Sequence, residues 1–437
     1  MHWLWSLVSV LPLHNHQAYQ VHAKDMSSRD LPATIHNGFI RLALHSSARA
    51  GDTIYIDGGE INFRGSYGDN GTGTVTLNHT LTLDLSRSWK SAEVPFQFIE
   101  KPPPVPTLNH GALWPAADNR SLFSFGGVRS PFPFTPRIPS IKLWKYSPPS
   151  GWVGLTSQSP VSPTLMDARP AAAAQTHSKD TGYMLGGFRG NDHAPFWPLP
   201  GMLTYNMTDN SWTNESTTSL TPFGIIGGGL TYIPSFGQNG ILIAMGGEYT
   251  GPGLWTETAS NLVAFTNISI WDIATKTWYS QTATANSDDS DIPASVTTFC
   301  STGIASPQGT FEIFVYGGYS NTFLLSSIAP SKVETDSQAL LNGVYVLSLP
   351  GFIWTKVDST AASRTGHTCH VIGNRQMLSI GGLDPSMPIN ASRNSLDTWQ
   401  HGLGIFDMVD LKWKESYDAN APAYVTPKVV GAWYDSQ

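Results

Sequence analysis

One motif recurs along the chain: an apolar, strand-forming run that ends in two consecutive glycines. It occurs six times, as TIYIDGG, SLFSFGG, GYMLGG, LIAMGG, FEIFVYGG and QMLSIGG. The first glycines of the doublets are Gly58, Gly126, Gly186, Gly246, Gly317 and Gly381. They are 68, 60, 60, 71 and 64 residues apart. A regular period of this kind indicates a repeat architecture, in which one structural unit is built six times.

Each doublet is followed by a loop of variable length, a further strand-like run and a tryptophan. The six tryptophans are Trp89, Trp152, Trp212, Trp278, Trp354 and Trp413. The apolar runs are short and bounded by Gly, Pro and Asn, which excludes long helices. Four short antiparallel strands make a twisted blade that buries its faces only against other blades around an axis. The sequence therefore predicts an all-β, six-bladed propeller of four-stranded blades, with a tryptophan filling each wedge between blades.

The sequence does not decide how the ring of blades closes. The segment YVTPKVVGAWY, residues 424–434, has the composition of one extra strand. Such a strand either completes a blade shared between the two termini or begins a seventh blade.

The repeat resembles the kelch repeat over about residues 38–415. The finer details resemble fungal kelch proteins grouped with the galactose oxidase central domain, on the stretches HSSARAGDTIYIDGGEIN, FCSTGIASPQGTFEIFVYGG and LSLPGFIWTKV followed by RTGHTCHVIGNRQMLSIGG. The resemblance implies a single kelch propeller domain over residues 24–437. Many relatives of this kind carry a membrane helix after the propeller, so the chain is expected to be either a form without that helix or a shortened one.

The same resemblance raises copper-radical oxidase chemistry, which needs two His and two Tyr ligands and a Cys joined to one Tyr. Phe299-Cys300 resembles the stretch that carries the oxidase cysteine, but Tyr232 is followed by Ile and the sixth repeat reads His-Thr-Cys-His without a Tyr. The expectation is therefore that the chain has no metal site and no cofactor.

The HTCH stretch belongs to the first strand of the sixth repeat. Because side chains alternate along a strand, His367 and Cys369 should point to one side and His370 to the other. Cys300 occupies the matching place in the fifth repeat. The two cysteines are predicted to be buried thiols, with a disulfide between them as the alternative.

The first strands of the other repeats also carry polar side chains. His45, His110, Arg169, Arg364 and His367 are weak candidates for a catalytic site at the mouth of the channel, where Arg364 and His367 should approach the axis. The alternative is that these groups bond to loop carbonyls and contact neighbouring blades.

The loops after the doublets are long and aromatic, and all should emerge on one face because all follow the same strand. Eight residues of these loops form the predicted binding surface: Phe132, Phe134, His193, Phe196, Trp197, Trp255, Trp399 and His401. Rigid aromatic side chains with polar neighbours are typical of interfaces. The alternative is that they pack the loops onto the propeller.

Two functions follow from these features. The first is a binding or scaffold propeller that holds a protein or a glycan on its loop face. The second is a cofactor-free enzyme, such as a hydrolase, isomerase or cyclase, at the channel mouth. The sequence contains no complete catalytic motif, so the binding module is preferred. A monomer is expected.

The remaining features concern location. The apolar N-terminus predicts a secretory signal over residues 1–23, with a cytosolic chain as the alternative. Seven Asn-x-Ser/Thr triplets predict glycosylation of a secreted protein, at Asn70, Asn78, Asn119, Asn206, Asn214, Asn267 and Asn390. No apolar run is long enough to cross a membrane. With a net charge of −7 and no basic patch, nucleic acid is not an expected partner.

Overall fold

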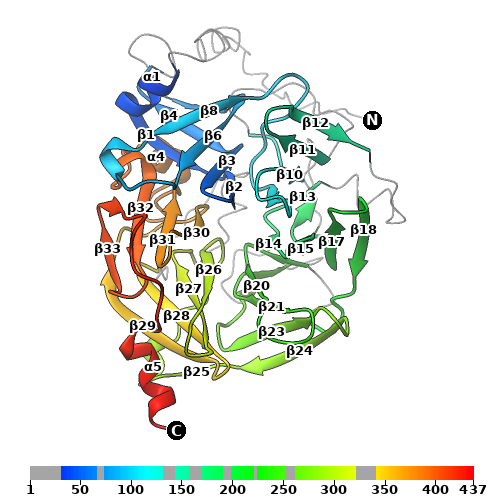
Figure 1. The fold of residues 1–437 in the computed structure, drawn as a ribbon, viewed down its shortest axis with the longest axis vertical. Helices are drawn as coiled ribbons and strands as arrows, with labels where there is room; N and C mark the ends of the chain where they lie inside the picture. Colours follow the sequence, from blue (N-terminus) through cyan, green and yellow to red (C-terminus); the bar gives the residue numbers. More distant parts are fainter. Residues whose placement is uncertain are drawn as a thin grey trace, which may run out of the picture.

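Six sheets surround a central axis in the computed structural model, each with four antiparallel strands and one with a fifth strand added (Figure 1). The structure describes residues 31–65, 73–130, 143–156, 169–189, 198–220, 224–250, 261–320 and 341–437. Each sheet takes its four strands from one stretch of chain that contains one Gly-Gly doublet. The predicted six-bladed, all-β architecture is therefore confirmed.

Each blade runs from an innermost strand at the axis to an outermost strand at the rim. The strands of blades one to three are β2 (Ser46–Ala50), β3 (Thr53–Asp57), β6 (His79–Asp84) and β8 (Phe96–Glu100); β9 (Ala112–Pro115), β10 (Leu122–Phe125), β11 (Leu143–Ser147) and β12 (Gly151–Leu155); β14 (Ala174–His177), β15 (Thr181–Leu185), β17 (Met202–Asn206) and β18 (Ser211–Glu215). The strands of blades four to six are β20 (Gly229–Ile233), β21 (Ile241–Met245), β23 (Asn267–Asp272) and β24 (Thr277–Thr282); β26 (Cys300–Ala305), β27 (Phe311–Tyr316), β28 (Gly343–Leu349) and β29 (Ile353–Thr360); β30 (Thr368–Ile372), β31 (Gln376–Ile380), β32 (Leu403–Asp407) and β33 (Lys412–Lys414). Blade five is extended by β25 (Thr284–Ala285), which pairs with β29 in parallel.

The Gly-Gly doublets connect each blade to the next. All twelve doublet glycines have positive φ, which other residues adopt only with strain. The second glycine of each doublet donates its N–H to a carbonyl of the following blade, as Gly59 does to Leu108 at 3.0 Å. Gly382 of blade six donates to Leu42, next to blade one, at 2.7 Å and so closes the ring. The doublets recur because the backbones of adjacent blades meet at these positions.

The tryptophans of the repeat fill the space between blades, as predicted. Trp212 is 1% exposed, and its ring centroid lies 4.4 Å from that of Phe125 in the preceding blade. Trp354 is fully buried, and its indole N–H donates to the carbonyl of Phe265 beside blade four at 2.9 Å. These large side chains therefore join the blades through packing, to which Trp354 adds a hydrogen bond.

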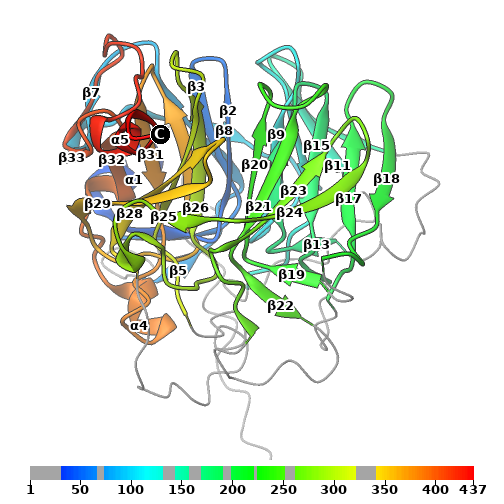
Figure 2. The ribbon, with the colours of Figure 1, turned by 90° about the horizontal axis from the view of Figure 1, so that it is seen from below.

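Short elements follow the doublets on one face of the disc. They include β5 (Thr74–Val75), which pairs with β4 (Glu60–Phe63) and through it with β1 (Phe39–Ala43), the pairs β13 (Pro170–Ala171) with β16 (Phe188–Arg189) and β19 (Gly224–Ile226) with β22 (Glu248–Thr250), and helix α4 (Ile389–Asn394). In Figure 2, β5, β13, β19, β22 and α4 all lie on the same side of the blades. The remaining short elements are α1 (Leu31–Gly38) and the 3-10 turns η2 (Ser91–Glu93), η4 (Asp289–Asp291) and η5 (Gln400–Gly402).

The ring closes without a shared blade, and the expected strand at residues 424–434 is wrong. Within the described ranges no seventh sheet of four strands occurs, and β2 contacts β30 directly. Outside the blades, β34 (Ser416–Tyr417) pairs with β7 (Trp89–Lys90). The C-terminal segment instead forms helix α5 (Lys428–Asp435), which begins after Pro427 and buries Val430.

Contacts with blade five explain why this segment forms a helix. The hydroxyl of Tyr434 accepts a hydrogen bond from the backbone N–H of Gly351 at 3.1 Å and lies 3.1 Å from the hydroxyl of Ser348. A helix brings Val430 and Tyr434, four residues apart, onto the same face toward blade five. A strand also places residues four apart on one face, but it spreads them over a much greater length.

Candidate functional site

A closed ring of backbone hydrogen bonds surrounds the axis just before the six inner strands. Each ring residue donates its N–H to the carbonyl of the ring residue in the neighbouring blade. The six bonds run from Leu44 to Gly366 (2.9 Å), Gly366 to Thr298 (3.2 Å), Thr298 to Gly227 (2.7 Å), Gly227 to Ala172 (2.9 Å), Ala172 to His110 (3.1 Å) and His110 to Leu44 (2.9 Å). All six residues have positive φ, between 52° and 64°. Four of the six are not glycine, and strained residues of this kind are often found at ligand sites.

The inner strands enclose a central cavity of about 440 Å³ that includes this ring. Its polar lining comes from all six blades: His45, Ser47, Arg49, His110, Gln175, Thr176, His177, Thr231, Tyr232, Thr298, Ser301, Thr302, His367, Thr368 and His370. His177, the last residue of β14, is exposed, so solvent reaches the cavity near the ends of the inner strands. The ends of the inner strands lie on the face of the disc opposite to the face that carries the short elements, such as β5 and α4.

A hydrogen-bonded chain of four side chains crosses the seam between blades one and six. His45 Nε2 lies 2.9 Å from Thr368 Oγ1, and the Ser47 hydroxyl donates to the same oxygen at 2.6 Å. The Ser47 oxygen in turn lies 2.6 Å from His370 Nε2. The chain therefore orients two histidines and two hydroxyls along the wall of the cavity.

Four histidines around the cavity are held in the neutral form. Burial lowers the pKa of His45 and His367 to about 3 and that of His110 and His370 to about 4. Nearby cationic or histidine neighbours add to this effect, as Arg364 does for His367. At neutral pH these rings therefore offer one N–H donor and one nitrogen acceptor each, without a charge.

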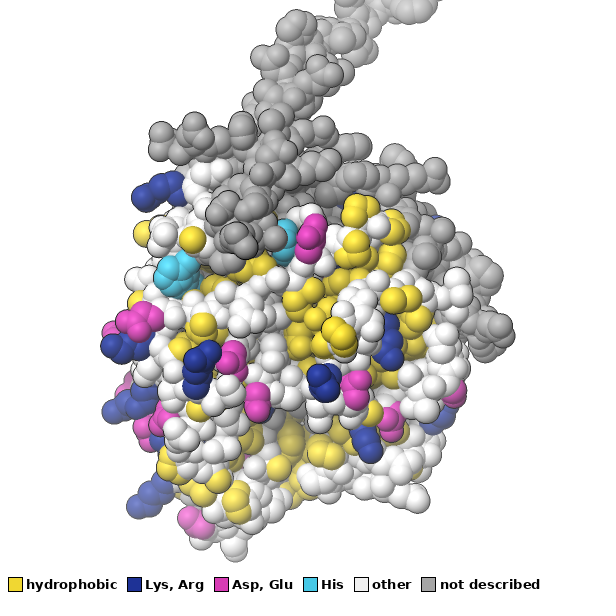
Figure 3. Space-filling model, turned by 45° about the horizontal axis from the view of Figure 1, so that its top comes forward, with side chains coloured by type: hydrophobic (Ala, Val, Ile, Leu, Met, Phe, Trp, Pro, Cys, Tyr) yellow, Lys and Arg dark blue, Asp and Glu magenta, His cyan; other side chains and the backbone are white. Residues whose placement is uncertain are grey.

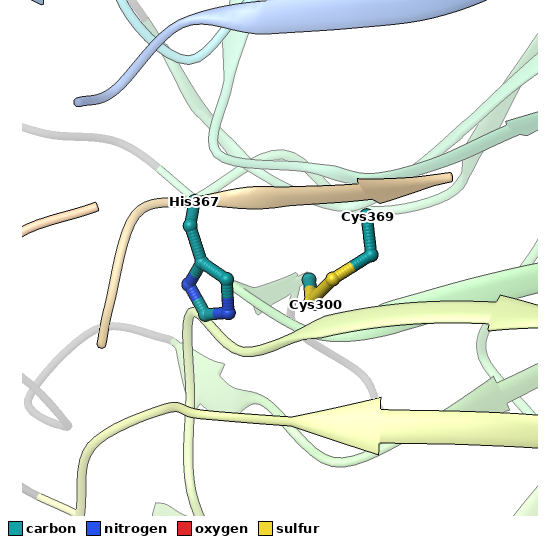
Figure 4. A group of neighbouring side chains, drawn as sticks. All are labelled: Cys300, His367 and Cys369. Atoms are coloured by element: carbon teal, nitrogen blue, oxygen red, sulfur yellow. A yellow bond between two sulfur atoms is a disulfide. The ribbon is translucent and has the colours of Figure 1, made fainter. Parts of the chain in front are cut away.

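His367 and the two cysteines meet on the wall between blades five and six (Figure 4). The structure joins Cys300 of β26 to Cys369 of β30 in a disulfide, with the Cα atoms 5.5 Å apart. His367 lies within 4.8 Å of the two sulfur atoms, whereas His370 faces blade one. The alternation expected along the HTCH strand is therefore observed. The expectation of no metal site stays a prediction.

Arg364 does not approach the axis, so this part of the prediction is wrong. Its guanidinium pairs with the carboxylate of Asp397, with Nη1 2.9 Å from Oδ2, and donates to the carbonyl of Gly381. It also stacks 3.6 Å from the ring centroid of Trp399. The side chain thus holds the loop after the sixth doublet. Arg169 lines a separate small cavity beside Ser46 and not the central one.

Of the eight predicted binding residues, Trp399 and His401 lie in the described part of the chain, and both pack against the propeller. His401 is 6% exposed and bonds through its two ring nitrogens to the carbonyls of Ser91 (2.8 Å) and His36 (3.0 Å). Trp399 is half-buried beneath Arg364. For these two residues the packing alternative is correct. The other six lie outside the described residues: Phe132, Phe134, His193, Phe196, Trp197 and Trp255.

The predicted glycosylation sites lie mostly on the surface. Five asparagines are exposed, namely Asn78, Asn119, Asn214, Asn267 and Asn390, and Asn206 is half-buried. Asn70 and the predicted signal at residues 1–23 lie outside the described residues. The exposed positions are sterically open to a glycan, and glycosylation itself stays a prediction.

Several lining residues were not among the candidates drawn from the sequence. Ser47, Arg49, Thr302 and Thr368 lie on inner strands, yet nothing in their local sequence marks them. Their position relative to the backbone ring could have identified them. Each residue of the ring lies two positions before the start of an inner strand, as Leu44 does before Ser46. Counting from each ring position would have identified the strand that faces the axis.

The fold and the cavity define the class of the protein: a six-bladed β-propeller with a polar central channel. The chain is 25% identical to a kelch repeat-containing protein of Arthroderma benhamiae (strain ATCC MYA-4681 / CBS 112371) over 450 aligned positions, which cover 92% of this chain. The alignment covers 60% of that relative's own length, so the chain spans less than two thirds of it. The chain matches no protein-family model.

The solved structure of YjhT shares the fold. It superposes with a TM-score of 0.55 at 14% identity, covering 87% of this chain and 98% of the other. The glycine-doublet repeat and the six blades therefore show a six-bladed β-propeller, which in sequence is similar to a kelch repeat-containing protein. The closer likeness to galactose oxidase central domains stays a prediction. Over the described ranges, no helix has the length and apolar character needed to span a bilayer.

Proposed function

We propose that this protein is a kelch-type binding module whose central channel holds a neutral, hydroxyl-rich ligand such as the end of a glycan. The observation that carries this proposal is the cavity of about 440 Å³ on the axis. Its volume falls in the range of about 300–1,000 Å³ typical of small-ligand sites. Hydroxyl, amide and imidazole groups from six blades converge on it, which suits a ligand with many hydroxyl groups.

The charge of the lining supports a neutral ligand. Among the described residues that line the cavity, none is Asp, Glu or Lys. The guanidinium of Arg49 is already engaged by the carbonyls of Val371 at 2.9 Å and Gly51 at 3.0 Å. Uncharged donors and acceptors bind sugar hydroxyls without the large desolvation penalty that a charged partner would impose.

The same features disfavour the enzyme alternative. Ser47 lies within hydrogen-bond distance of His370, as a nucleophile and its base would. However, burial lowers the pKa of His370 to about 4. Such an imidazole is weaker as a base by roughly two to three orders of magnitude than an unperturbed histidine. The described lining also contains no carboxylate to orient the ring, so binding is the better explanation of this site.

We also propose that the protein is secreted or displayed on a surface. Exposed sequons at Asn78, Asn119, Asn214, Asn267 and Asn390 support this location. On the face visible in Figure 3, acidic and basic side chains are interspersed, so no broad basic patch is seen there. A protein partner on the loop face is the second candidate. This loop-face candidate is tested by substituting both Trp197 and Trp255 with alanine. Trp399 is left unchanged because it packs against the propeller.

The channel proposal is tested by filling the cavity. Thr302, half-buried on β26, lines the channel, and Thr302→Tyr places a phenol ring in the space. Thr282→Tyr is the matched control, because Thr282 is exposed on the outermost strand β24. Binding of short neutral oligosaccharides is measured by titration calorimetry and ligand-observed NMR.

Two results distinguish the candidates. The channel proposal expects binding by the wild type and by Thr282→Tyr, and loss of binding by Thr302→Tyr. Equal binding by both variants, or no oligosaccharide bound by the wild type, would refute it. Capture of a protein partner that is lost only in the Trp197 and Trp255 double variant would instead support the loop face.

A further inference from the structure

Three side chains that are good metal ligands meet at one point on the channel wall. Cys300 begins β26, Cys369 lies in β30, and His367 immediately precedes β30. Their ligand atoms all lie within 4.8 Å of one another, and the residues are 5%, 8% and 6% exposed. Figure 4 shows the imidazole and the two sulfur atoms in the same gap between the strands.

The position of this group gives small solutes a route to it. All three residues line the central cavity, which solvent reaches near His177. A small thiol reductant and a metal ion can therefore enter through the channel without unfolding a blade. In the structure the two sulfurs are bonded, so a metal site here requires the reduced form.

The surroundings of His367 suit a ligand. One ring nitrogen, Nε2, lies 3.2 Å from the carbonyl oxygen of Tyr316. Within the described structure, the buried Nδ1 has no hydrogen-bond partner. Figure 4 shows Nε2 as the ring nitrogen on the side of the two sulfur atoms, so Nε2 is the nitrogen that a metal ion would bind, with the ring proton moved to Nδ1.

We propose that the reduced form of Cys300 and Cys369, together with His367, binds one thiophilic divalent cation of the Zn²⁺ class. A small-molecule dithiol supplies two electrons and two protons: it becomes a cyclic disulfide, and the protein disulfide becomes two thiols. The cation then displaces one proton from each thiol and binds both thiolates and one imidazole nitrogen. The fourth position faces the channel and is open to water or a ligand, as in other Cys₂His zinc sites.

Geometry and charge both fit this assignment. In a tetrahedral zinc site the bonds are about 2.3 Å to sulfur and about 2.0 Å to nitrogen, which places the ligand atoms roughly 3.5–3.8 Å apart. Rotation of the cysteine side chains provides this separation while the Cα atoms stay near 5.5 Å. Two thiolates balance a divalent cation, whereas two uncompensated buried thiolates would be strongly disfavoured. Thiolate and imidazole ligands select Zn²⁺ over Mg²⁺ or Ca²⁺.

The test uses Co²⁺ as a spectroscopic probe of the full-length protein. The chain is reduced with a dithiol, freed of reductant under anaerobic conditions and titrated with Co²⁺. The expected result is one Co²⁺ per chain, with thiolate-to-cobalt charge-transfer bands and the intense visible bands of tetrahedral Co²⁺. Zn²⁺ should then displace the Co²⁺ and abolish the spectrum. The oxidised protein should show none of these bands.

Variants separate a built site from accidental binding. Cys300→Ser and Cys369→Ser should each lose the charge-transfer bands, and His367→Gln should lose the intense visible bands while retaining sulfur-to-cobalt absorption. Circular dichroism confirms that each reduced variant is folded. The proposal is overturned if folded, reduced wild type binds no Co²⁺, if the oxidised protein binds it equally, or if the reduced chain in urea binds it as tightly.

Discussion

Replacement of Gly58 by alanine should strongly destabilise the protein, because this glycine stands where two blades touch. Its φ is +71°, and an added Cβ would lie 2.0 Å from the carbonyl oxygen of Leu108. The same oxygen accepts the N–H of Gly59 at 3.0 Å. The left-handed conformation costs alanine about 1–2 kcal/mol, and loss of the buried hydrogen bond costs about 1–3 kcal/mol more. We therefore expect the free energy of unfolding to fall by roughly 2–5 kcal/mol.

Gly151→Ala is the matched control for this prediction. Gly151 also has positive φ, +82°, but nothing lies within 4 Å of the place that its Cβ would take. It should lose only the conformational part, about 1–2 kcal/mol. Both variants are measured by equilibrium urea denaturation, followed by tryptophan fluorescence. If the two variants are destabilised to the same extent, within about 0.5 kcal/mol, then contact between blades does not explain the glycine doublets.

Two further predictions concern buried charges. Arg364→Ala removes the principal partner of the buried Asp397 carboxylate and leaves it a longer ion pair with Arg41, at 3.8 Å. It should lower the free energy of unfolding by about 3 kcal/mol, the lower end of the range for a broken buried pair. Lys276→Ala, which breaks an exposed pair with Glu215, should cost at most about 1 kcal/mol, and equal urea midpoints would contradict this. Burial raises the pKa of Glu248 to about 7, above its ordinary value of 4.5. The folded state therefore prefers the protonated acid, and this contribution to stability is complete below pH 4.5 and is lost as the pH rises through 7. Relative to Glu248→Gln, the wild type should thus lose up to roughly 3 kcal/mol between pH 4.5 and pH 8, and parallel pH–stability curves would contradict the assignment.

The sequence predicted the blades because the features that define them are local. Each Gly-Gly doublet marks the end of a second strand, where the backbone must adopt positive φ beside the next blade. Five of the six tryptophans lie just inside an outermost strand, as Trp152 and Trp354 do, whereas Trp89 lies in β7 outside the blades. These signals depend on one residue and its neighbours in the chain, so they can be read without knowledge of long-range contacts.

The candidate site was only partly predictable, since it is made of groups that meet across blades. His45, His110 and His367 were identified and do line the cavity. Arg364 was misplaced because its partner Asp397 lies 33 residues away in a loop, and a buried ion pair outweighs the direction of the strand. Ser47 and His370 were missed as a pair because 323 residues separate them.

The sequence by itself determined the number of blades and the sides of the strand taken by His367, Cys369 and His370. Only the tertiary structure decided which of these residues share one space. Ring closure brings the first blade against the sixth, and that contact creates the Ser47–His370 bond and completes the six-membered backbone ring. Tertiary contacts with blade five likewise decided that the C-terminal segment, expected as a strand, forms helix α5. Local chemistry specifies each blade, whereas the channel exists only when all six blades meet.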